Sequence, residues 1–151
     1  MAILREQILQ QLVSQLEGIT TAGDAYHTDL GQNVSLWRAT KFQPAELPAL
    51  NVKDKSDAIS SEAMNGPANE TLHELAVEIS VLCKSGVTDA VVRQMIYDVY
   101  KAIGNDPSFG GNAIDCDQQG DEMQVDQEED KIGGATITIS IKYVTNKFSE
   151  S

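Results

Sequence analysis

Residues 70–84 read ETLHELAVEISVLCK, and this stretch decides the fold class. From Leu75 to Cys83 every odd position is apolar, and the even positions between them include Glu78 and Ser80. A period of two predicts a strand with one buried face and one more polar face, which is typical of an antiparallel sheet. Residues Ala135 to Val144 repeat the alternation, so the same sheet gains a second long strand near the end of the chain.

In the sequence, one helix is expected before the first long strand and one after it. Between Ile3 and Ile19, apolar residues recur every three or four positions, which is the period of one helix face. A second apolar stripe runs from about Thr88 to Ile103, and Gly104 follows as a helix terminator. The order helix, strands, helix, strands predicts an α+β fold, with an antiparallel or mixed central sheet packed against two main helices.

The remaining segments are weaker signals. We expect a hairpin from Tyr26–Leu30 and Val34–Arg38 through the GQN turn at 31–33, and a short strand at Ala49–Lys53. Further short strand candidates are Ile114, Cys116 and Gln124–Val125. A single domain over residues 1–146 would then contain a long mobile loop at 54–70 and an acidic loop at 115–130, followed by a frayed tail at 147–151.

Composition narrows the class of protein. The chain has 151 residues, with 11 Lys and Arg against 23 Asp and Glu, for a formal net charge of −12. This balance argues against direct, specific nucleic-acid binding and against an anionic membrane surface. No apolar run approaches the roughly 20 residues that a transmembrane helix needs. Arg5 and Glu6 interrupt the apolar stretch that a signal peptide needs, so we expect a soluble protein of a reducing compartment.

We expect no enzyme and no cofactor. The sequence contains no P-loop, dinucleotide-binding, zinc-protease or C-x-x-C motif. The two cysteines, Cys83 and Cys116, form no disulfide framework, and Cys83 falls on the buried face of its strand. His73 shares that face near the start of the strand, where a structural role is expected, and His27 is placed for a local hydrogen bond with Asp29.

The densest acidic stretch, DCDQQGDEMQVDQEED at 115–130, opens like an EF-hand calcium loop. Asp115, Asp117 and Asp126 would stand at positions 1, 3 and 12, with Gly120 at position 6. Position 5 is Gln119, and position 8 is the charged Glu122 where those loops carry an apolar residue. A solvated hairpin is therefore the preferred interpretation and a calcium site the weaker one.

Two features suit assembly better than catalysis. Trp37 and Arg38 lie on a short strand that an edge could present, and both residue types are enriched at interface hot spots, although a core position for Trp37 is the alternative. Glu74 and Glu78 occupy the polar face of the long strand. They would line an acidic lumen if the sheet joined a ring, or simply form a solvated face.

Several phrases of this chain occur together in one known family. They are Leu47-Pro48-Ala49-Leu50-Asn51-Val52, the helix pattern V-V-x-x-x-I-x-D-V-x-x-A-I at 91–103, the run DQEEDKIG from Asp126 to Gly133, and the closing Lys142-Tyr143. With the order of elements over residues 1–146, the chain resembles the tail terminator (minor tail protein U-like) proteins of long-tailed bacteriophages and prophages.

The resemblance implies a structural virion protein. Such proteins form a ring, commonly of six subunits, that caps the tail tube, stops its polymerisation and offers the head-joining surface. The implied partners are other copies of the chain, the tail tube protein and the head-side connector. The implied location is the tail or neck of the virion, after assembly in the bacterial cytoplasm.

Acidic residues enter this hypothesis as contacts between subunits. The negative charge of each subunit would keep free subunits apart and steer them to a complementary surface. The candidates for this role are Asp126, Glu128, Glu129 and Asp130. The alternatives are another head–tail joining or baseplate-associated protein, or a small cytoplasmic adaptor.

Overall fold

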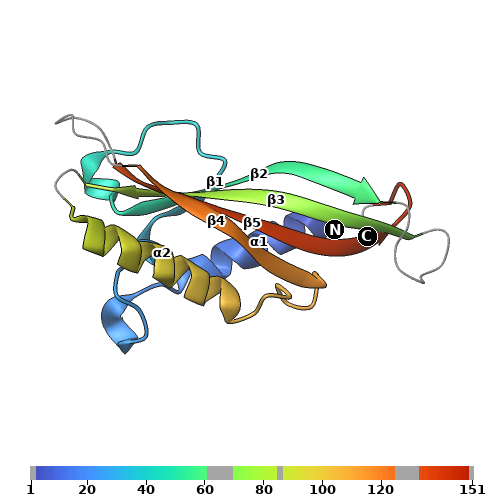
Figure 1. The fold of residues 1–151 in the computed structure, drawn as a ribbon, viewed down its shortest axis with the longest axis horizontal. Coiled ribbons are helices and arrows are strands. Elements are labelled where there is room, and N and C mark those ends of the chain that lie inside the picture. The colour runs from blue at the N-terminus through green and yellow to red at the C-terminus, as the bar shows by residue number, and fades with distance from the viewer. Residues whose placement is uncertain (1–2, 61–69, 85–86, 125–132, 150–151) are drawn as a thin grey trace.

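The computed structural model describes residues 3–60, 70–84, 87–124 and 133–149. Within them the chain forms two α-helices and one five-stranded mixed sheet, which confirms the predicted α+β fold (Figure 1). The helices are α1 (Leu4–Glu17) and α2 (Asp89–Gly104). The strands are β1 (Val34–Leu36), β2 (Ala49–Ser60), β3 (Glu70–Cys83), β4 (Asp115–Gln124) and β5 (Gly133–Asn146).

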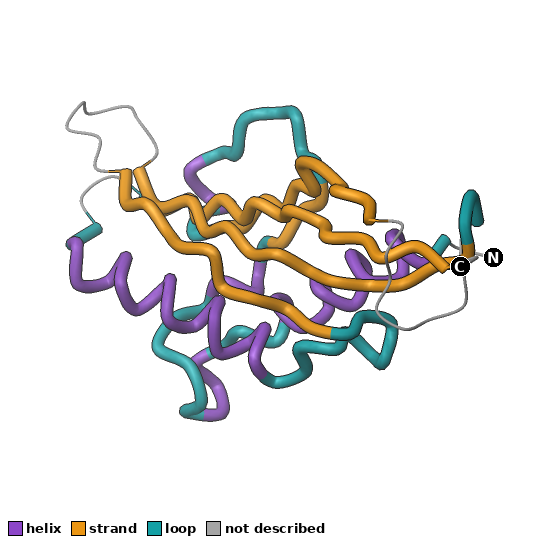
Figure 2. The backbone as a smooth tube through the Cα atoms, turned by 45° about the vertical axis from the view of Figure 1, so that its right-hand side comes forward, coloured by secondary structure: helices purple, strands orange, loops and turns teal. Residues whose placement is uncertain are grey.

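Both helices lie on the same side of the sheet, as Figure 2 shows. The predicted apolar stripes form this contact, because Ile8, Leu12 and Leu16 of α1 are completely buried against the sheet. At the start of α2, the hydroxyl of Thr88 accepts a hydrogen bond from the backbone N–H of Val91, as expected of an N-cap residue. The main core is thus a single layer between the helices and one sheet face.

The sheet order is β1-β2-β3-β5-β4, with β3 in the centre. The strand predicted at 70–84 is confirmed as β3, and its odd positions from Leu75 to Cys83 are buried as expected. It pairs antiparallel with β2 and with β5 over nearly its whole length. The last strand is longer than predicted, since it runs from Gly133 to Asn146.

The prediction of a loop at 54–70 is wrong for residues 54–60 and for Glu70. Strand β2 continues to Ser60 and pairs with β3 up to the partners Ser60 and Leu72, while residues 61–69 lie outside the described part. The polar residues of this stretch form a strand because side chains from elsewhere satisfy them. Asp54, for example, accepts hydrogen bonds from Arg5 of α1.

The hairpin predicted between Tyr26 and Arg38 is also wrong. Residues Leu30–Gln32 form a short 3-10 helix, and β1 pairs with β2 in parallel. Two tertiary contacts fix this path. The carboxylate of Asp98 on α2 accepts hydrogen bonds from the backbone N–H groups of His27 and Thr28, and Gly31 donates to the carbonyl of Ile19. Asp29 bonds Thr20 and Thr21 rather than His27.

The acidic segment is not a loop over residues 115–124, and the antiparallel pairing of β4 with β5 agrees with the hairpin that was the preferred interpretation. Residues 115–124 form one continuous strand that pairs antiparallel with β5, instead of separate short strands at Cys116 and Gln124–Val125, and Ile114 precedes it. An extended strand sends Asp115 and Asp117 to the same sheet face but cannot wrap oxygens around one ion, so the EF-hand-like conformation is not formed there. Asp126 lies outside the described residues. At the chain end, residues 147–149 form a turn that follows β5.

Candidate functional site

Trp37 is held at the surface by a constrained backbone. It follows β1 rather than lying within it, has a left-handed φ of 55°, and is 51% exposed. Its N–H donates to the carbonyl of Val52 at 2.8 Å, and the buried amide of Asn51 bonds both the N–H and the carbonyl of Arg38 at 3.0 Å. A non-glycine residue with positive φ persists only where its surroundings hold it. The exposed ring is therefore fixed in place, and it does not belong to the core.

The Trp37 ring sits between a carboxylate and two lysines. Its Nε1–H donates to Oδ1 of Asp54 at 2.5 Å. The ammonium groups of Lys53 and Lys55 lie 5.8 and 5.6 Å from the ring centre, within the range of cation–π attraction. Burial opposes ionisation of Asp54, but hydrogen bonds from Trp37 and Arg5 outweigh it, so the pKa of Asp54 is lowered. An ionised Asp54 thus anchors the indole.

Arg38, the other residue predicted for an interface here, is already engaged. Its guanidinium forms a two-pronged ion pair with Glu46, at 2.5 and 3.0 Å, and lies 4.0 Å from the centre of the Phe42 ring. Phe42 and Leu47 in turn pack against Ala49 and form a small second core. Arg38 therefore braces the segment between β1 and β2.

The Arg38–Glu46 pair predicts an acid-dependent loss of stability. Hydrogen bonds from Arg38 and from the backbone of Gln43 lower the pKa of Glu46 from 4.5 to about 2. A carboxyl with a depressed pKa stabilises the fold above its unfolded pKa and loses that contribution as the pH falls through its folded pKa. Wild type should therefore exceed Glu46→Gln in unfolding free energy at pH 6, and the difference should shrink by pH 2.5. Urea unfolding at both pH values measures it, and a difference that does not change with pH contradicts the assignment.

A second set of polar residues continues from Asp54 toward the far end of the sheet. Oδ2 of Asp57 accepts hydrogen bonds from Nδ1 of His73 and from the hydroxyl of Tyr143, both at 2.8 Å. Arg5 links this carboxylate to Asp54, with its NH1 3.7 Å from Asp57. These side chains link the start of α1 to strands β2, β3 and β5, which also pair with one another through their backbones.

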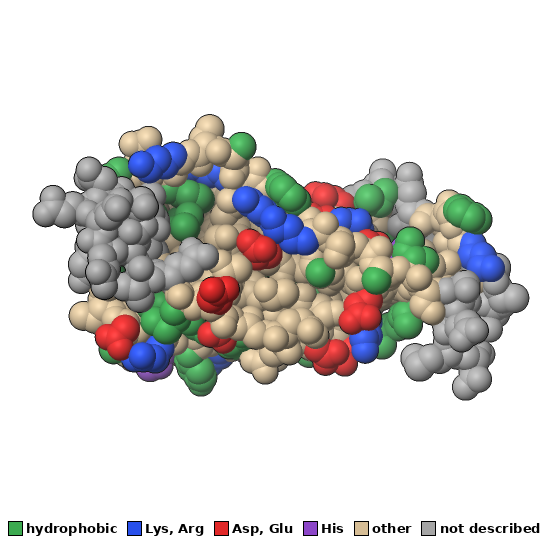
Figure 3. Space-filling view, turned by 45° about the horizontal axis from the view of Figure 1, so that its top comes forward, with side chains coloured by type: hydrophobic (Ala, Val, Ile, Leu, Met, Phe, Trp, Pro, Cys, Tyr) green, Lys and Arg blue, Asp and Glu red, His purple; other side chains and the backbone are tan. Residues whose placement is uncertain are grey.

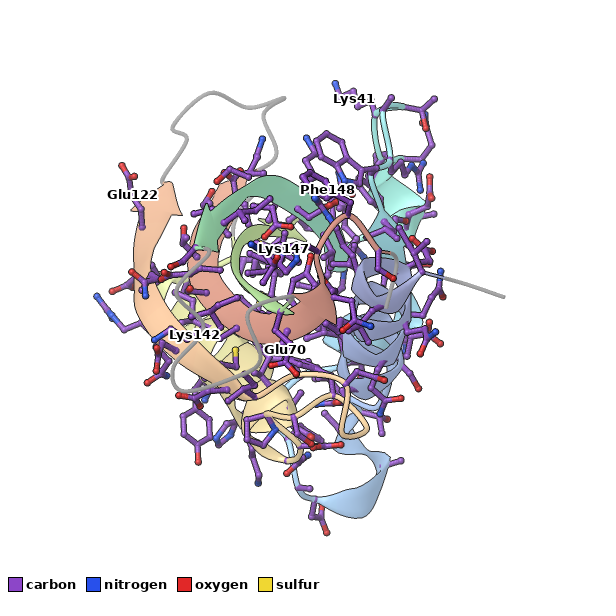
Figure 4. All side chains as sticks on the ribbon, turned by 90° about the vertical axis from the view of Figure 1, so that its right-hand side faces the viewer. Lys41, Glu70, Glu122, Lys142, Lys147 and Phe148 are labelled. Carbon is purple, nitrogen blue, oxygen red and sulfur yellow. The ribbon has the colours of Figure 1, made fainter. Side chains whose placement is uncertain are left out.

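His73 extends this network to a cavity at the sheet end. Its Nε2 hydrogen-bonds Oγ1 of Thr145 at 2.8 Å, and its ring stacks on Tyr143 with centres 4.4 Å apart. The cavity has a volume of about 360 Å³, and the C-terminal turn contributes Lys147 and Phe148, labelled in Figure 4. It is lined by Ile59, Thr71, His73, Thr145, Lys147, Phe148 and Ser149.

The order Asp57, His73, Thr145 is that of a carboxylate–imidazole–hydroxyl relay in hydrolases. Here Thr145 is only 5% exposed, and Asp57 is shared with Tyr143 and Arg5. Burial, followed by the hydrogen bond to Asp57, raises the pKa of Tyr143, so its phenol stays protonated and donates. These features fit a set of hydrogen bonds that hold the strand ends together better than they fit an activated nucleophile. They agree with the structural role expected of His73.

Most of this network was not predicted from the sequence. Asp57 falls in the stretch predicted to be a loop, and Arg5 stands outside the apolar stripe of its helix. A signal was present in the alternation of β5, which puts Tyr143 and Thr145 on the buried face, where Tyr143 pairs with His73 and Thr145 with Thr71. Both thiols are poor nucleophiles, since burial raises the pKa of Cys83, and burial with Asp115 and Asp117 raises that of Cys116 to about 12.

Glu74 and Glu78 lie on the sheet face opposite the helices, as predicted. Their cross-strand neighbours include Lys142 for Glu74 and Lys53 for Glu78, and Glu74 accepts a hydrogen bond from Ser140 at 3.0 Å. Figure 3 shows this side of the molecule, with uncharged polar and backbone atoms across its middle and charged groups scattered around them. The carboxylates thus face lysines on neighbouring strands.

Strands β2 and β4 differ in the charges that they carry. We call Lys53 and Lys55 on β2, which both lie within about 6 Å of the Trp37 ring centre, the basic edge, and the four carboxylates of β4 the acidic edge. The acidic edge comprises Asp115, Asp117, Asp121 and Glu122. Among the described residues, no group of three or more His, Cys, Asp or Glu side chains is arranged to hold a metal ion. The predicted contacts Asp126, Glu128, Glu129 and Asp130 lie outside the described part.

A scan against protein-family models finds no match to this chain, and a search of curated proteins finds no similar sequence. Within the described part of the chain, no helix is long and apolar enough to cross a membrane.

Proposed function

We propose that this chain is a structural virion protein, a tail terminator that caps the tail tube as a ring and provides the head-joining surface. The observation that carries the proposal is Trp37, a large aromatic ring half exposed on a rigid backbone at the side of the sheet. Fixed aromatic anchors lose little entropy on docking and dominate the energetics of protein interfaces. A subunit of an assembly uses such a residue to anchor its contact with a neighbour. The order of helices and strands supports the terminator role in particular.

The one-sided sheet suits a ring subunit. The helices cover one face, and much of the other face carries small or uncharged side chains such as Ser56, Ala76 and Thr138. If these faces line the lumen, Glu74 and Glu78 would be balanced by Lys142 and Lys53 on neighbouring strands. We therefore propose a polar lumen of low net charge at this level, rather than the acidic one that the two glutamates alone suggest.

Light scattering after size exclusion, over a series of protein concentrations, tests the proposal. Six copies of 16.4 kDa should appear as a discrete species of about 98 kDa, with rings in negative-stain images. If assembly needs the tube, the ring should form on purified tail tubes of a long-tailed phage and halt their growth. A chain that stays monomeric alone and leaves tube growth unchanged contradicts the proposal.

A cytoplasmic adaptor is the second candidate, because an exposed Trp37 would equally anchor a different protein. It predicts a monomer or dimer at every concentration. Another head–tail joining or baseplate-associated role would also give an oligomer, and it differs from the terminator in leaving tube length unchanged.

A further inference from the structure

The two sides of the sheet carry opposite charge, so each copy of the chain has one basic side and one acidic side. Beyond Val52, the last partner of β1, strand β2 forms one side of the sheet in the described residues, and β4 forms the other. Figure 4 shows Glu122 of the acidic edge on one side of the molecule and Lys41, in the segment between β1 and β2, on the other. A contact between opposite edges of two copies therefore leaves one edge of each copy available for the next.

The side chains of β2 divide by face. Asp54 and Asp57 point toward the helix side of the sheet, where Arg5 contacts both carboxylates and His73 hydrogen-bonds Asp57. Lys53 lies on the other face, and Lys55 is the extra residue of a bulge between Asp54 and Ser56. This strand therefore presents lysines outward beside the exposed Trp37 ring, although the whole chain is strongly acidic.

Strand β4 has the reverse character. Its sequence, DCDQQGDEMQ, contains four carboxylates and no lysine or arginine. Lys142 of β5 lies 3.7 Å from Asp117, Asp121 accepts a hydrogen bond from the Tyr100 hydroxyl, and Asp115 accepts one from the backbone N–H of Cys116 at 2.8 Å. This strand also has an irregular register, between Gln118 and Gly120.

Bulges and like charges on an outer strand prevent it from pairing with an identical strand. Two basic edges would bring lysines together, and two acidic edges would bring carboxylates together. Only a basic edge against an acidic edge is electrostatically favourable, which is how charge selects one partner over another. Such a head-to-tail contact repeats from copy to copy and closes into a ring when the rotation allows.

We infer that the basic edge, with Trp37 as its anchor, docks side chain to side chain on the acidic edge of a second copy of this chain. The inference rests on the proposed ring and adds which surfaces meet. It also predicts that raising the ionic strength weakens assembly, because solvent-exposed charge pairs are screened.

Charge exchange tests the inference. Lys53→Glu with Lys55→Glu, and separately Asp117→Lys with Glu122→Lys, should each raise the concentration needed for half assembly by about tenfold or more. The four substitutions combined should restore assembly, because the two edges are again opposite. Lys84→Glu with Arg93→Glu, both exposed and on neither edge, changes the net charge as the first pair does and should leave assembly unchanged. Circular dichroism checks that each variant is folded.

Each outcome has one meaning. A wild-type ring with assembly unchanged in both edge variants overturns the inference and leaves the ring standing. Loss in both variants without recovery in the combined chain also overturns it, because then the charges do not act on each other. A wild type that does not assemble, alone or on tail tubes, overturns the ring and the inference together. Binding of a single-stranded oligonucleotide that is lost with Lys53→Glu and Lys55→Glu assigns the basic edge to nucleic acid instead.

Discussion

Replacing Asp98 with alanine is expected to lower the free energy of unfolding by about 3 kcal/mol. The Asp98 side chain on α2 is completely buried and accepts hydrogen bonds from the N–H groups of His27 and Thr28 and from the Thr28 hydroxyl, at 2.7–3.1 Å. Alanine leaves these donors without an acceptor in a site where Thr28 is almost fully buried. Urea unfolding followed by circular dichroism measures the loss.

Two variants show whether the hydrogen bonds or the charge matter. Asp98→Asn keeps the shape and one accepting oxygen, so it should lose less than Asp98→Ala. Asp89→Ala lies on the same helix, where its ion pair with Arg93 is exposed to solvent, and should lose much less than Asp98→Ala. Equal losses at Asp98 and Asp89 would show that the buried carboxylate does not hold the 27–28 segment.

Periodic segments were predictable from sequence because burial repeats along them. The alternation of β3 and the three-to-four spacing in α1 and α2 are imposed by one core face, so each element carries its own signal. The hydrophobic pattern also placed Cys83 in the core and Glu74 on the opposite face. Fold class and the positions of the long elements follow from this.

The outer half of β2 was not predictable because its stability comes from distant residues. Its polar residues look like a loop, yet Asp54 is bound by Arg5, 49 positions away, and Asp57 by Tyr143, 86 positions away. Similarly, Asp98 looks like an ordinary polar residue of an amphipathic helix until the backbone of Thr28 reaches it. Such pairings arise only when the sheet brings the segments together.

The candidate site was predicted only in part, because it too depends on contacts between residues that are distant in the sequence. The residue type identified Trp37, but its exposure depends on a left-handed backbone that Asn51 and Asp54 hold. The overall charge was plain from composition, whereas the separation of the lysines of β2 from the carboxylates of β4 depends on the order of strands in the sheet.

Gly134→Ala is expected to be among the most destabilising small changes in the sheet, at about 3 kcal/mol. Gly134 stands where β5 faces Leu82 of β3 on one side and β4 on the other. A Cβ built there would lie 1.7 Å from the carbonyl oxygen of Val81, a backbone atom that a side-chain rotation cannot move away. The strands must therefore separate locally, and hydrogen bonds of the β3–β5 ladder are lost. Urea unfolding of the variant and wild type measures the difference.

Two other glycines separate the close contact from the loss of glycine itself. Gly104, at the end of α2, has open space around its Cβ position, so Gly104→Ala should be neutral or stabilise by up to about 1 kcal/mol. Gly120 also has open space but a φ of 143°, so Gly120→Ala should show the backbone strain without a clash. If Gly134→Ala costs no more than Gly120→Ala, β3 and β5 are not as close at this point as the structure has them. If it costs far more, β4 should also lose its support from β5, and assembly through the acidic edge should fall together with stability.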